Sequence, residues 1–345
     1  MSDDDLEDLE ADQDDFEKED DKDTEELEES RKDGEDMSSE EQWVPTPLSE
    51  DMVKEGLSML CKTGTGLAHA FVKLEVKDRD LTDITMLQSY IHLRYVDISN
   101  NHLVDLSPLN NLTHLLWLKA DNNQLRSARL RELPYLQIAS FAYNQITSTE
   151  GITHPRLNSL DLKGNHIRSV TDLDPQKLQS LQTLELRGNQ LTSTLGLALP
   201  KLKNLFLAQN QLRKVEGLES LSNLTTLHLR DNLIDTLSGF SKKMKSLQYL
   251  NMRGNLLSDL SELTKLRELP KLRALVLMEN PCSDETEYRQ EALVQMAHLE
   301  RLDKDFYEEE ERVEADELRQ RLKEDTETEQ DNEPPPELGA SASFN

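Results

Sequence analysis

The chain of 345 residues has little of what marks several protein classes. It holds two cysteines, Cys61 and Cys282, and aromatic residues make up 5% of it. Two isolated thiols give no disulfide framework, so both are expected to be reduced and structural. No apolar run approaches the length that spans a bilayer, and the start, Met1-Ser-Asp-Asp-Asp, has neither a basic region nor an apolar core. These absences predict an intracellular protein, in the cytoplasm, with no membrane partner.

Positive charge is also scarce, with 39 Lys and Arg against 68 Asp and Glu. The imbalance lies at the ends, because residues 1–42 hold 23 acidic and 4 basic residues, and residues 308–345 hold 14 and 4. The body between them is close to neutral, and no nucleic-acid partner is expected. Segments this charged and this poor in apolar residues cannot offset the entropy of ordering. Residues 1–44 are therefore expected to be an acidic disordered arm, and residues 325–345 a disordered tail.

The chain is rich in one phrase, L-x-x-L-x-L-x-x-N-x-L, which recurs ten times. A clear copy runs from Leu181 to Leu191 and a degenerate first copy starts at Phe71. The starts are mostly 21 or 22 residues apart, with spacings of 23, 24 and 25 in three places. A fixed period in this range is typical of a leucine-rich-repeat solenoid, in which no unit buries its apolar face alone. The fold class is therefore an α/β solenoid of about ten repeats with one parallel sheet on its concave side.

Each part of the motif has a structural role. Leu184 and Leu186 alternate with period two, so both point inward from a short strand. The asparagine lies where the chain leaves the strand, and its amide can satisfy backbone groups there. Nine asparagines occupy this position in register: Asn101, Asn123, Asn144, Asn165, Asn189, Asn210, Asn232, Asn255 and Asn280. The longer spacings predict extra helical turn around residues 175–180 and 261–268.

Both ends of the array need covers, because terminal repeats otherwise expose core. Residues 45–70 are expected to form a helical N-terminal cap, with Ser49 as N-cap and a helix from about Glu50 to Cys61. The array itself spans residues 71–282, and residues 283–306 are expected to close it. Residues 307–324 are expected to form an acidic helix that projects from this cap. This helix either docks on a neighbouring subunit or remains a solvated extension.

A search for catalytic chemistry finds nothing specific. The eight histidines have no metal-ligand spacing, and Lys62-Thr-Gly-Thr-Gly66 lacks the order and the preceding strand of a phosphate loop. No catalytic residue, cofactor, metal or small-molecule substrate is expected. Binding of other protein subunits is the function class that remains.

Outward positions of the predicted strands are the third, fifth and seventh of each motif. Tyr95 and Trp117 would adjoin as one aromatic site, and Phe206 would lie near arginines as a second, basic one. The candidate partner-binding residues are Tyr95, Trp117, Lys163, Arg187, Phe206, Arg230, Tyr249 and Arg253. Exposed aromatics and arginines dominate interface energetics, although Tyr and Trp also suit strands in general. The arginines favour an acidic partner, and the chain's own acidic ends are a second candidate occupant.

Specific segments carry a family resemblance. The repeats and the Asn280-Pro281 cap are similar to regulators of type-1 protein phosphatase and to leucine-rich-repeat proteins of cilia. Four segments, at 43–48 (WVPTPL), 93–98 (LRYVDI), 140–146 (SFAYNQI) and 289–296 (RQEALVQM), more closely resemble the radial-spoke leucine-rich-repeat proteins of motile cilia and sperm flagella. The resemblance implies a structural subunit of the axonemal radial spoke, needed for motility, with other spoke components as partners.

Two other functions stay open on the residues alone. An acidic nuclear leucine-rich-repeat protein that binds histones would also join a solenoid to acidic ends, although its long acidic run would be C-terminal. A regulatory subunit of a type-1 protein phosphatase would use its concave face and would need no acidic arm. Nuclear or flagellar staining by antibody would separate these alternatives.

Overall fold

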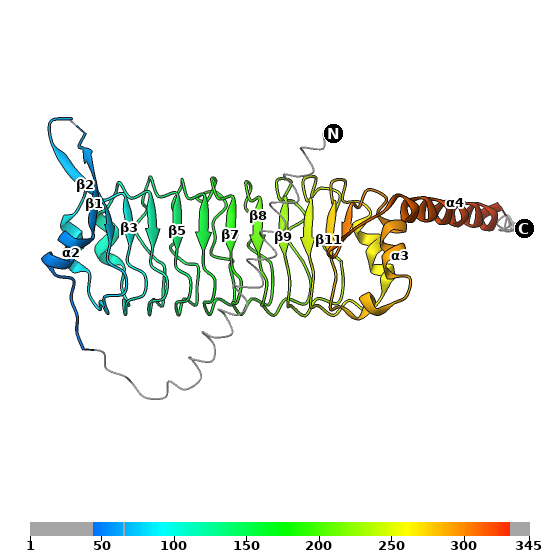
Figure 1. The fold of residues 1–345 in the computed structure, drawn as a ribbon, viewed down its shortest axis with the longest axis horizontal. Coiled ribbons are helices and arrows are strands. Elements are labelled where there is room, and N and C mark those ends of the chain that lie inside the picture. Colours follow the sequence, from blue (N-terminus) through cyan, green and yellow to red (C-terminus); the bar gives the residue numbers. More distant parts are fainter. Residues whose placement is uncertain (1–43, 65, 332–345) are drawn as a thin grey trace, which may run out of the picture.

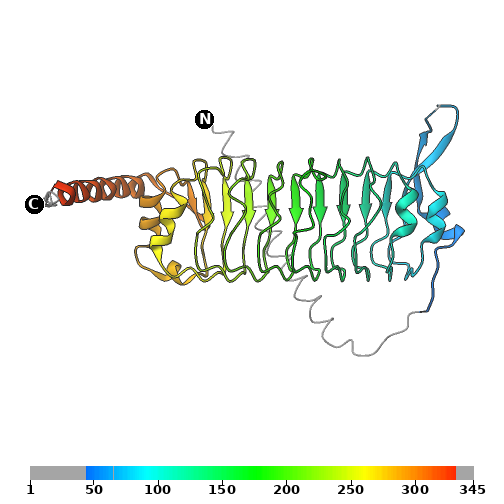
Figure 2. The same ribbon diagram turned by 180° about the vertical axis from the view of Figure 1, so that it is seen from behind.

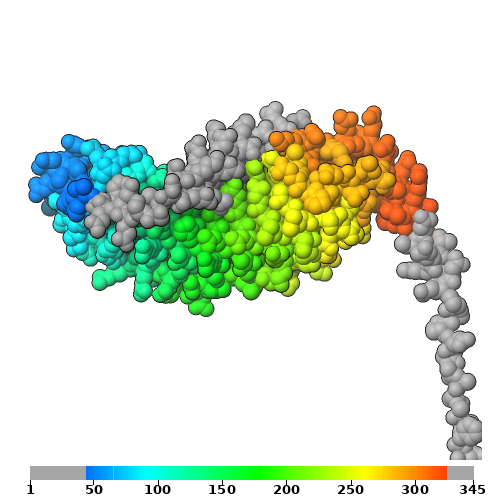
Figure 3. All heavy atoms as spheres, turned by 90° about the horizontal axis from the view of Figure 1, so that it is seen from below, coloured from blue at the N-terminus to red at the C-terminus, as the bar shows by residue number. Residues whose placement is uncertain are grey.

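The computed structural model describes residues 44–64 and 66–331. In these residues the chain winds into coils that stack side by side along one long axis (Figure 1). The N-terminal residues of this body lie at one end and the C-terminal residues at the other (Figure 3). Each coil therefore contacts mainly its neighbours, as expected of a solenoid.

One short strand from each repeat forms a continuous sheet. The motif strands are β2 (His69–Glu75), β3 (Tyr95–Asp97), β4 (Trp117–Lys119), β5 (Ile138–Ser140), β6 (Ser159–Asp161), β7 (Thr183–Glu185), β8 (Asn204–Phe206), β9 (Thr226–His228), β10 (Tyr249–Asn251) and β11 (Ala274–Val276). Every neighbouring pair among them is parallel and in the register of the motif, so that Leu184 lies opposite Leu205. The predicted ten-stranded parallel sheet is confirmed.

The sheet is longer than the array at both ends. Strand β1 (Leu57–Lys62) pairs antiparallel with β2, strand β12 (Arg301–Leu302) pairs parallel with β11, and β13 (Asp305–Phe306) pairs antiparallel with β12. These additions bond backbone groups of the terminal repeats that would otherwise face water or another chain.

The N-terminal cap differs from the prediction. Ser49 is the N-cap of helix α2 (Glu50–Gly56), with its hydroxyl accepting from the Met52 N–H at 3.3 Å, but the helix ends at Gly56 and not near Cys61. A side chain at Gly56 would collide with the Glu75 carbonyl oxygen, 2.4 Å from its Cβ. The chain passes close to β2 there, which explains the glycine, and the next residues pair with β2 as strand β1. Beyond Lys62 the chain turns back into β2, with the Thr63 N–H donating to the Ala68 carbonyl at 2.8 Å and the Gly66 N–H donating to the Thr63 carbonyl at 2.7 Å.

Short 3₁₀ segments lie in the return paths of a few coils. They are η1 (Thr85–Ser89), η2 (Ser107–Asn111), η3 (Leu260–Leu266) and η4 (Pro281–Asp284). Helical segments gather towards the two ends of the stack, whereas the central coils return through turns (Figure 2). The extra helix predicted for residues 261–268 is confirmed as η3. The segment 175–180 forms only a turn, closed by the Leu178 N–H on the Asp174 carbonyl at 2.9 Å.

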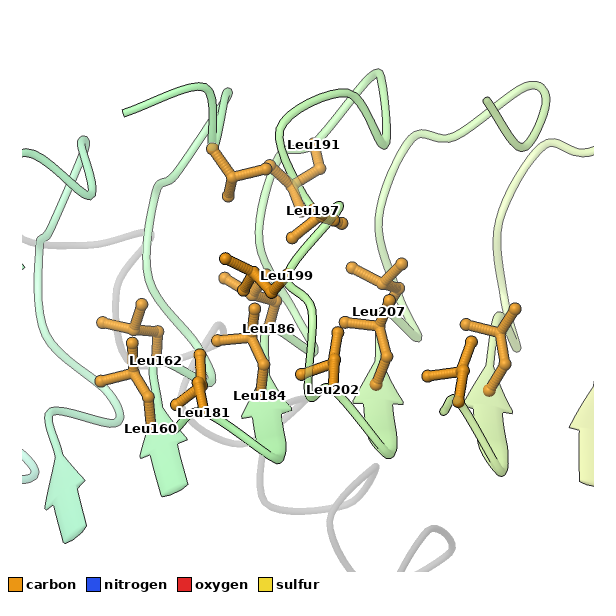
Figure 4. Close-up of a cluster of buried hydrophobic side chains, with 14 of the residues drawn as sticks. Leu160, Leu162, Leu181, Leu184, Leu186, Leu191, Leu197, Leu199, Leu202 and Leu207 are labelled. Carbon is orange, nitrogen blue, oxygen red and sulfur yellow. The ribbon is translucent and has the colours of Figure 1, made fainter. Parts of the chain in front are cut away.

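The core is a continuous stack of leucines. Leu186, Leu207 and Leu229, which share one inward position in successive coils, are all wholly buried. Figure 4 shows leucines of neighbouring coils facing one another between the strands and the return paths. The alternation read from the motif therefore gives the inward side chains correctly.

The asparagines form the expected ladder, and all nine are buried. The Asn189 side-chain oxygen accepts from the Ile167 N–H of the preceding coil at 3.0 Å, and its amide donates to the Leu162 and Leu186 carbonyls at 2.9 and 3.0 Å. The same pattern recurs at the other positions, for example at Asn210. Each asparagine thus bonds one coil to the next in a region that water does not reach.

The C-terminal cap closes the stack as expected. Helix α3 (Tyr288–Gln295) packs Leu293 into the core, and Leu302 of β12 is also buried. Asp303 bonds the cap to the last repeat, because one of its carboxylate oxygens accepts from the Leu277 and Met278 N–H groups at 2.7 and 3.0 Å. Its other oxygen accepts from the Tyr288 hydroxyl at 3.0 Å, which fixes α3 against the last repeat.

Helix α4 (Glu309–Asp331) is longer and better anchored than predicted. It extends from the end of the stack (Figure 1), but Ala315 on its first half is wholly buried. Arg319 donates to the Leu293 and Val294 carbonyls, which end α3 and have no helical partner, and Arg312 donates to the Leu299 carbonyl. The helix also runs through residues 325–331, where disorder was expected. The disorder predicted for residues 1–43 and 332–345 lies outside the described residues.

One histidine occupies a core position. His154 stands where other repeats have leucine, as in Leu133 and Leu199, and it is 1% exposed. Its Nδ1 accepts from the Leu133 N–H at 3.1 Å, so the ring is neutral. Burial lowers the pKa of His154 from 6.5 to about 4. The unfolded chain therefore binds a proton below pH 6.5 that the folded chain does not, and stability is lost as the pH falls from 6.5 towards 4.

We expect His154→Leu to flatten this part of the pH dependence. A pKa difference of this size lowers the free energy of unfolding of the parent by about 3 kcal/mol at most between pH 7 and pH 4. Most of this decrease should be absent in the variant. At pH 7 the variant should be slightly less stable, because the Leu133 N–H loses its acceptor. Urea titrations at several pH values measure both effects, with the exposed His298→Leu as control. If the stability of His154→Leu fell with pH as much as that of the parent, His154 would not be the source of this pH dependence.

Candidate functional site

The outward face of the sheet, formed by the third, fifth and seventh motif positions, holds all eight candidate residues. Neighbouring members of a column lie on adjacent strands, about 4.8 Å apart. The structure places Tyr95 opposite Trp117 on β3 and β4, as predicted, and both side chains are partly buried. Trp117 in turn lies opposite the exposed Ile138 of β5, so this end of the face carries a short apolar row.

A second group of rings crosses three strands nearer the C-terminal end. The Phe206 ring of β8 lies 4.8 Å from the His228 ring of β9, and the His228 ring lies 5.1 Å from the Tyr249 ring of β10, centroid to centroid. Both pairs are tilted, a geometry in which aromatic rings attract. His228 is the residue that the sequence reasoning omitted. Its place in the fifth column, directly beside Phe206, was the signal that could have included it.

Arginines follow these rings in the seventh column. Arg230 and Arg253 come from adjacent coils, which are joined by a hydrogen bond of 2.8 Å from the Asp231 N–H to the Arg253 carbonyl. Arg187 follows the end of β7. We call the six residues Arg187, Phe206, His228, Arg230, Tyr249 and Arg253 the arginine–aromatic patch. Beyond it, Ala274 and Val276 of β11 continue the apolar floor beside Tyr249, and Arg301 of β12 is a further buried arginine next to Ala274.

The side chains of this patch are less exposed than a simple outward position implies. His228 is 0% exposed, and the Arg230 and Arg253 side chains are 11% and 24% exposed. The expectation that both arginines point freely into solvent is therefore wrong. Part of the cause is contact with neighbours, since Arg230 lies 3.2 Å from an Asp231 oxygen and Arg253 donates twice to Glu279, at 3.0 and 2.6 Å.

Carboxylates at the fifth position have a structural role. Asp161 and Glu185 each accept from the N–H two residues later at 2.8 Å, where the chain leaves the strand. Burial raises the pKa of Asp161 to about 6 and that of Glu185 to about 8, although Arg187, 3.5 Å from Glu185, acts in the opposite direction. The raised pKa of Glu185 weakens the compensation of the Arg187 charge by this carboxylate.

The two groups of aromatic residues remain separate. Four strand spacings, roughly 19 Å, divide Trp117 on β4 from Phe206 on β8. Lys163 lies between them, with its amine 5.2 Å from the centre of the Tyr143 ring, which is a cation–π contact. The face therefore offers two anchor regions to an extended partner, of which the arginine–aromatic patch is the larger.

Within residues 44–64 and 66–331, no group of His, Cys, Asp or Glu side chains is arranged to hold a metal ion. In the same residues no helix combines the length and apolarity of a membrane span. Burial raises the pKa of the Cys282 thiol to about 11, so this cysteine is not a nucleophile at neutral pH.

Comparisons with known proteins agree with this architecture. The chain matches Leucine-rich repeat families over residues 92–115 and 182–330. An internalin from Listeria monocytogenes has the same fold, with a TM-score of 0.51 and 18% identity over 73% of this chain and 88% of that one.

Relatives in several vertebrates match over most of the chain. Leucine-rich repeat-containing protein 23 of Bos taurus is 76% identical over 81% of both chains. The protein of that name in Mus musculus is 71% identical over 94% of this chain and 95% of its own length. Identity this high over nearly the full length places the chain among these proteins, and it belongs to the leucine-rich repeat-containing protein 23 family.

Proposed function

We propose that the protein is a non-catalytic scaffold that binds other proteins through the outward face of its sheet, as a structural subunit of the axonemal radial spoke. The leucine-rich-repeat fold and the family support a role in protein interaction. The assignment to the radial spoke of motile cilia and sperm flagella rests on the family resemblance stated above.

The observation that carries the binding proposal is the arginine–aromatic patch. Three rings in contact and three arginines lie on a rigid sheet, held from below by the leucine core. Side chains fixed in this way lose little entropy on binding, and aromatic residues and arginines are the types that anchor interfaces. We therefore propose that this patch holds most of the binding energy and that Tyr95 and Trp117 support it.

We expect Arg230→Glu combined with Arg253→Glu to abolish partner capture. Loss of one anchor costs about 2 kcal/mol or more, about thirty-fold in affinity, and the reversed charges also repel an acidic partner. The measurement is quantitative pull-down of radial-spoke proteins from an axonemal extract. A matched control, Lys242→Glu with Lys243→Glu, changes the net charge equally at two exposed residues outside the sheet.

The burial of both arginines makes a folding control necessary. Glutamate at 230 or 253 would face Asp231 or Glu279, so thermal melts must show that the variant is folded. Arg230→Gln with Arg253→Gln removes the charges without this repulsion and should also lose capture. Capture equal to the parent by both folded variants would overturn the assignment to this face. Capture of a phosphatase catalytic subunit or histones in place of spoke proteins, or nuclear staining, would overturn the axonemal role.

A further inference from the structure

The arginine–aromatic patch combines two kinds of chemistry in one place. Phe206 and Tyr249 contribute two rings that are only 7% and 4% exposed, and the buried Ala274 and Val276 lie beside Tyr249. Arg187, Arg230 and Arg253 border the rings in the seventh column. A complementary occupant is an extended acidic segment that also carries a few apolar side chains.

Three carboxylates lie beside these arginines: Glu185 is 3.5 Å from Arg187, Asp231 is 3.2 Å from Arg230 and Glu279 is 2.6 Å from Arg253. Burial raises the pKa of Glu185 to about 8 and also raises the pKa of Asp231, which weakens the charge compensation by these two carboxylates. Arg301 adds a further buried cation beside Ala274. Charges in a poorly solvated environment interact more strongly than charges in water, so the patch should favour an acidic occupant.

This chain contains a segment of that composition. Residues 1–42 hold 23 acidic and 4 basic residues, and the acids are interspersed with a few large apolar residues: Leu6, Leu9, Phe16 and Leu27. The stretch around Phe16 reads Asp-Asp-Phe-Glu, which pairs one ring with three carboxylates. Both components of the complementary chemistry are therefore present.

The segment is also long enough to reach the patch. The described chain starts beside the N-terminal cap, next to β2, and β9 lies seven strand spacings away, roughly 34 Å. The 28 residues from Phe16 to Val44 would span on the order of 30 Å as a random coil, and far more when extended. Attachment to the same chain gives an effective concentration in the millimolar range. An intrinsic dissociation constant of about 100 μM would then keep the patch about nine-tenths occupied.

We propose that residues 1–42 of the same chain bind the arginine–aromatic patch, with their carboxylates on the arginines and their apolar side chains on the rings. The arm is then an internal competitor of any acidic partner, which must displace it to bind. This inference goes beyond the proposed function, because intramolecular binding of the arm requires no spoke component.

Trypsin cleavage of the arm in the full-length protein tests the proposal. The arm has four cleavage positions, Lys18, Lys22, Arg31 and Lys32. Trypsin cuts the arm only in the fraction of molecules in which the arm has left the patch. Cleavage in the parent should therefore be about ten-fold slower than in a synthetic peptide of residues 1–42. In Arg230→Glu with Arg253→Glu, the rate should rise to that of the peptide. In Lys242→Glu with Lys243→Glu, it should stay at the parent value. Mass spectrometry follows each cut, and thermal melts check that the variants are folded.

Two further measurements separate the possible results. Neutralising Asp12, Asp14, Asp15 and Glu17 to their amides leaves the folded body untouched and should release the arm in the same way. Sodium chloride at about 0.5 M shortens the screening length and should bring the parent rate towards that of the peptide at the same salt. Parent cleavage as fast as that of the peptide at low salt would overturn the proposal. Protection that appears only as protein concentration rises would also overturn it, because the arm of a second copy would then be the occupant. None of these outcomes depends on partner capture.

Discussion

Asn189→Ala is expected to destabilise the protein by about 3–5 kcal/mol, more than any exposed substitution. The variant removes the acceptor of the Ile167 N–H and the donor to the Leu162 and Leu186 carbonyls, all in buried backbone. The Ile167 N–H is left without its acceptor, which costs about 1–3 kcal/mol for a buried group. The two carbonyls keep the amides of Asn165 and Asn210, each at 3.0 Å, so the loss of each Asn189 bond to them costs about 1 kcal/mol. Because Asn189 joins two coils in the middle of the array, the loss should also lower the cooperativity of unfolding.

Urea unfolding followed by circular dichroism measures this loss. The matched control is Asn223→Ala, since Asn223 is exposed and makes a single bond to the Pro200 carbonyl at 2.9 Å. The control should lose about 1 kcal/mol or less. Asn189→Asp keeps an acceptor for Ile167 but places a carboxylate against two carbonyls, so it should be no more stable than Asn189→Ala. Equal stabilities of Asn189→Ala and Asn223→Ala would show that the ladder is not a source of stability.

Leu207→Ala is expected to cost about 2–5 kcal/mol. Leu207 is wholly buried between Leu186 and Leu229 of the adjacent coils, so its truncation leaves a cavity that the rigid stack cannot fill. Since each coil is stabilised by its neighbours, the effect should reach the adjacent repeats and broaden the transition.

Thermal and urea melts provide the comparison for this substitution. Leu256→Ala removes the same atoms at a residue that is 47% exposed, and it should cost about 1 kcal/mol or less. Hydrogen exchange in β7 to β9 should accelerate in Leu207→Ala before exchange in β3 does. Melting curves of Leu207→Ala that overlay those of the parent would contradict the inward assignment of this position.

The local sequence pattern was sufficient to predict the structure of the repeated part of the molecule. The alternation of Leu184 and Leu186 and the recurrence of asparagine define the strand, its inward face and the turn, because each coil repeats one set of contacts with its neighbours. The ten parallel strands, the buried leucines and the Asn ladder therefore follow from the period alone. The same periodicity correctly assigned the outward positions that contain the arginine–aromatic patch.

Contacts between segments distant in the sequence determined the features that the repeat pattern did not predict. Helix α2 ends at Gly56 where the following residues pair with β2, and a Cβ at Gly56 would lie 2.4 Å from the Glu75 carbonyl oxygen. No local pattern near Gly56 reveals this contact. Likewise, α4 is anchored because Arg312 and Arg319 reach carbonyls at the end of the cap. The column of His228 could have placed it beside Phe206, but the contact of its ring with both Phe206 and Tyr249 is seen only in the structure. The sequence by itself determined the structure of the repeated coils, since each repeat packs against copies of itself. The structure of the two caps and the burial of each outward side chain depend on contacts that only the tertiary structure sets.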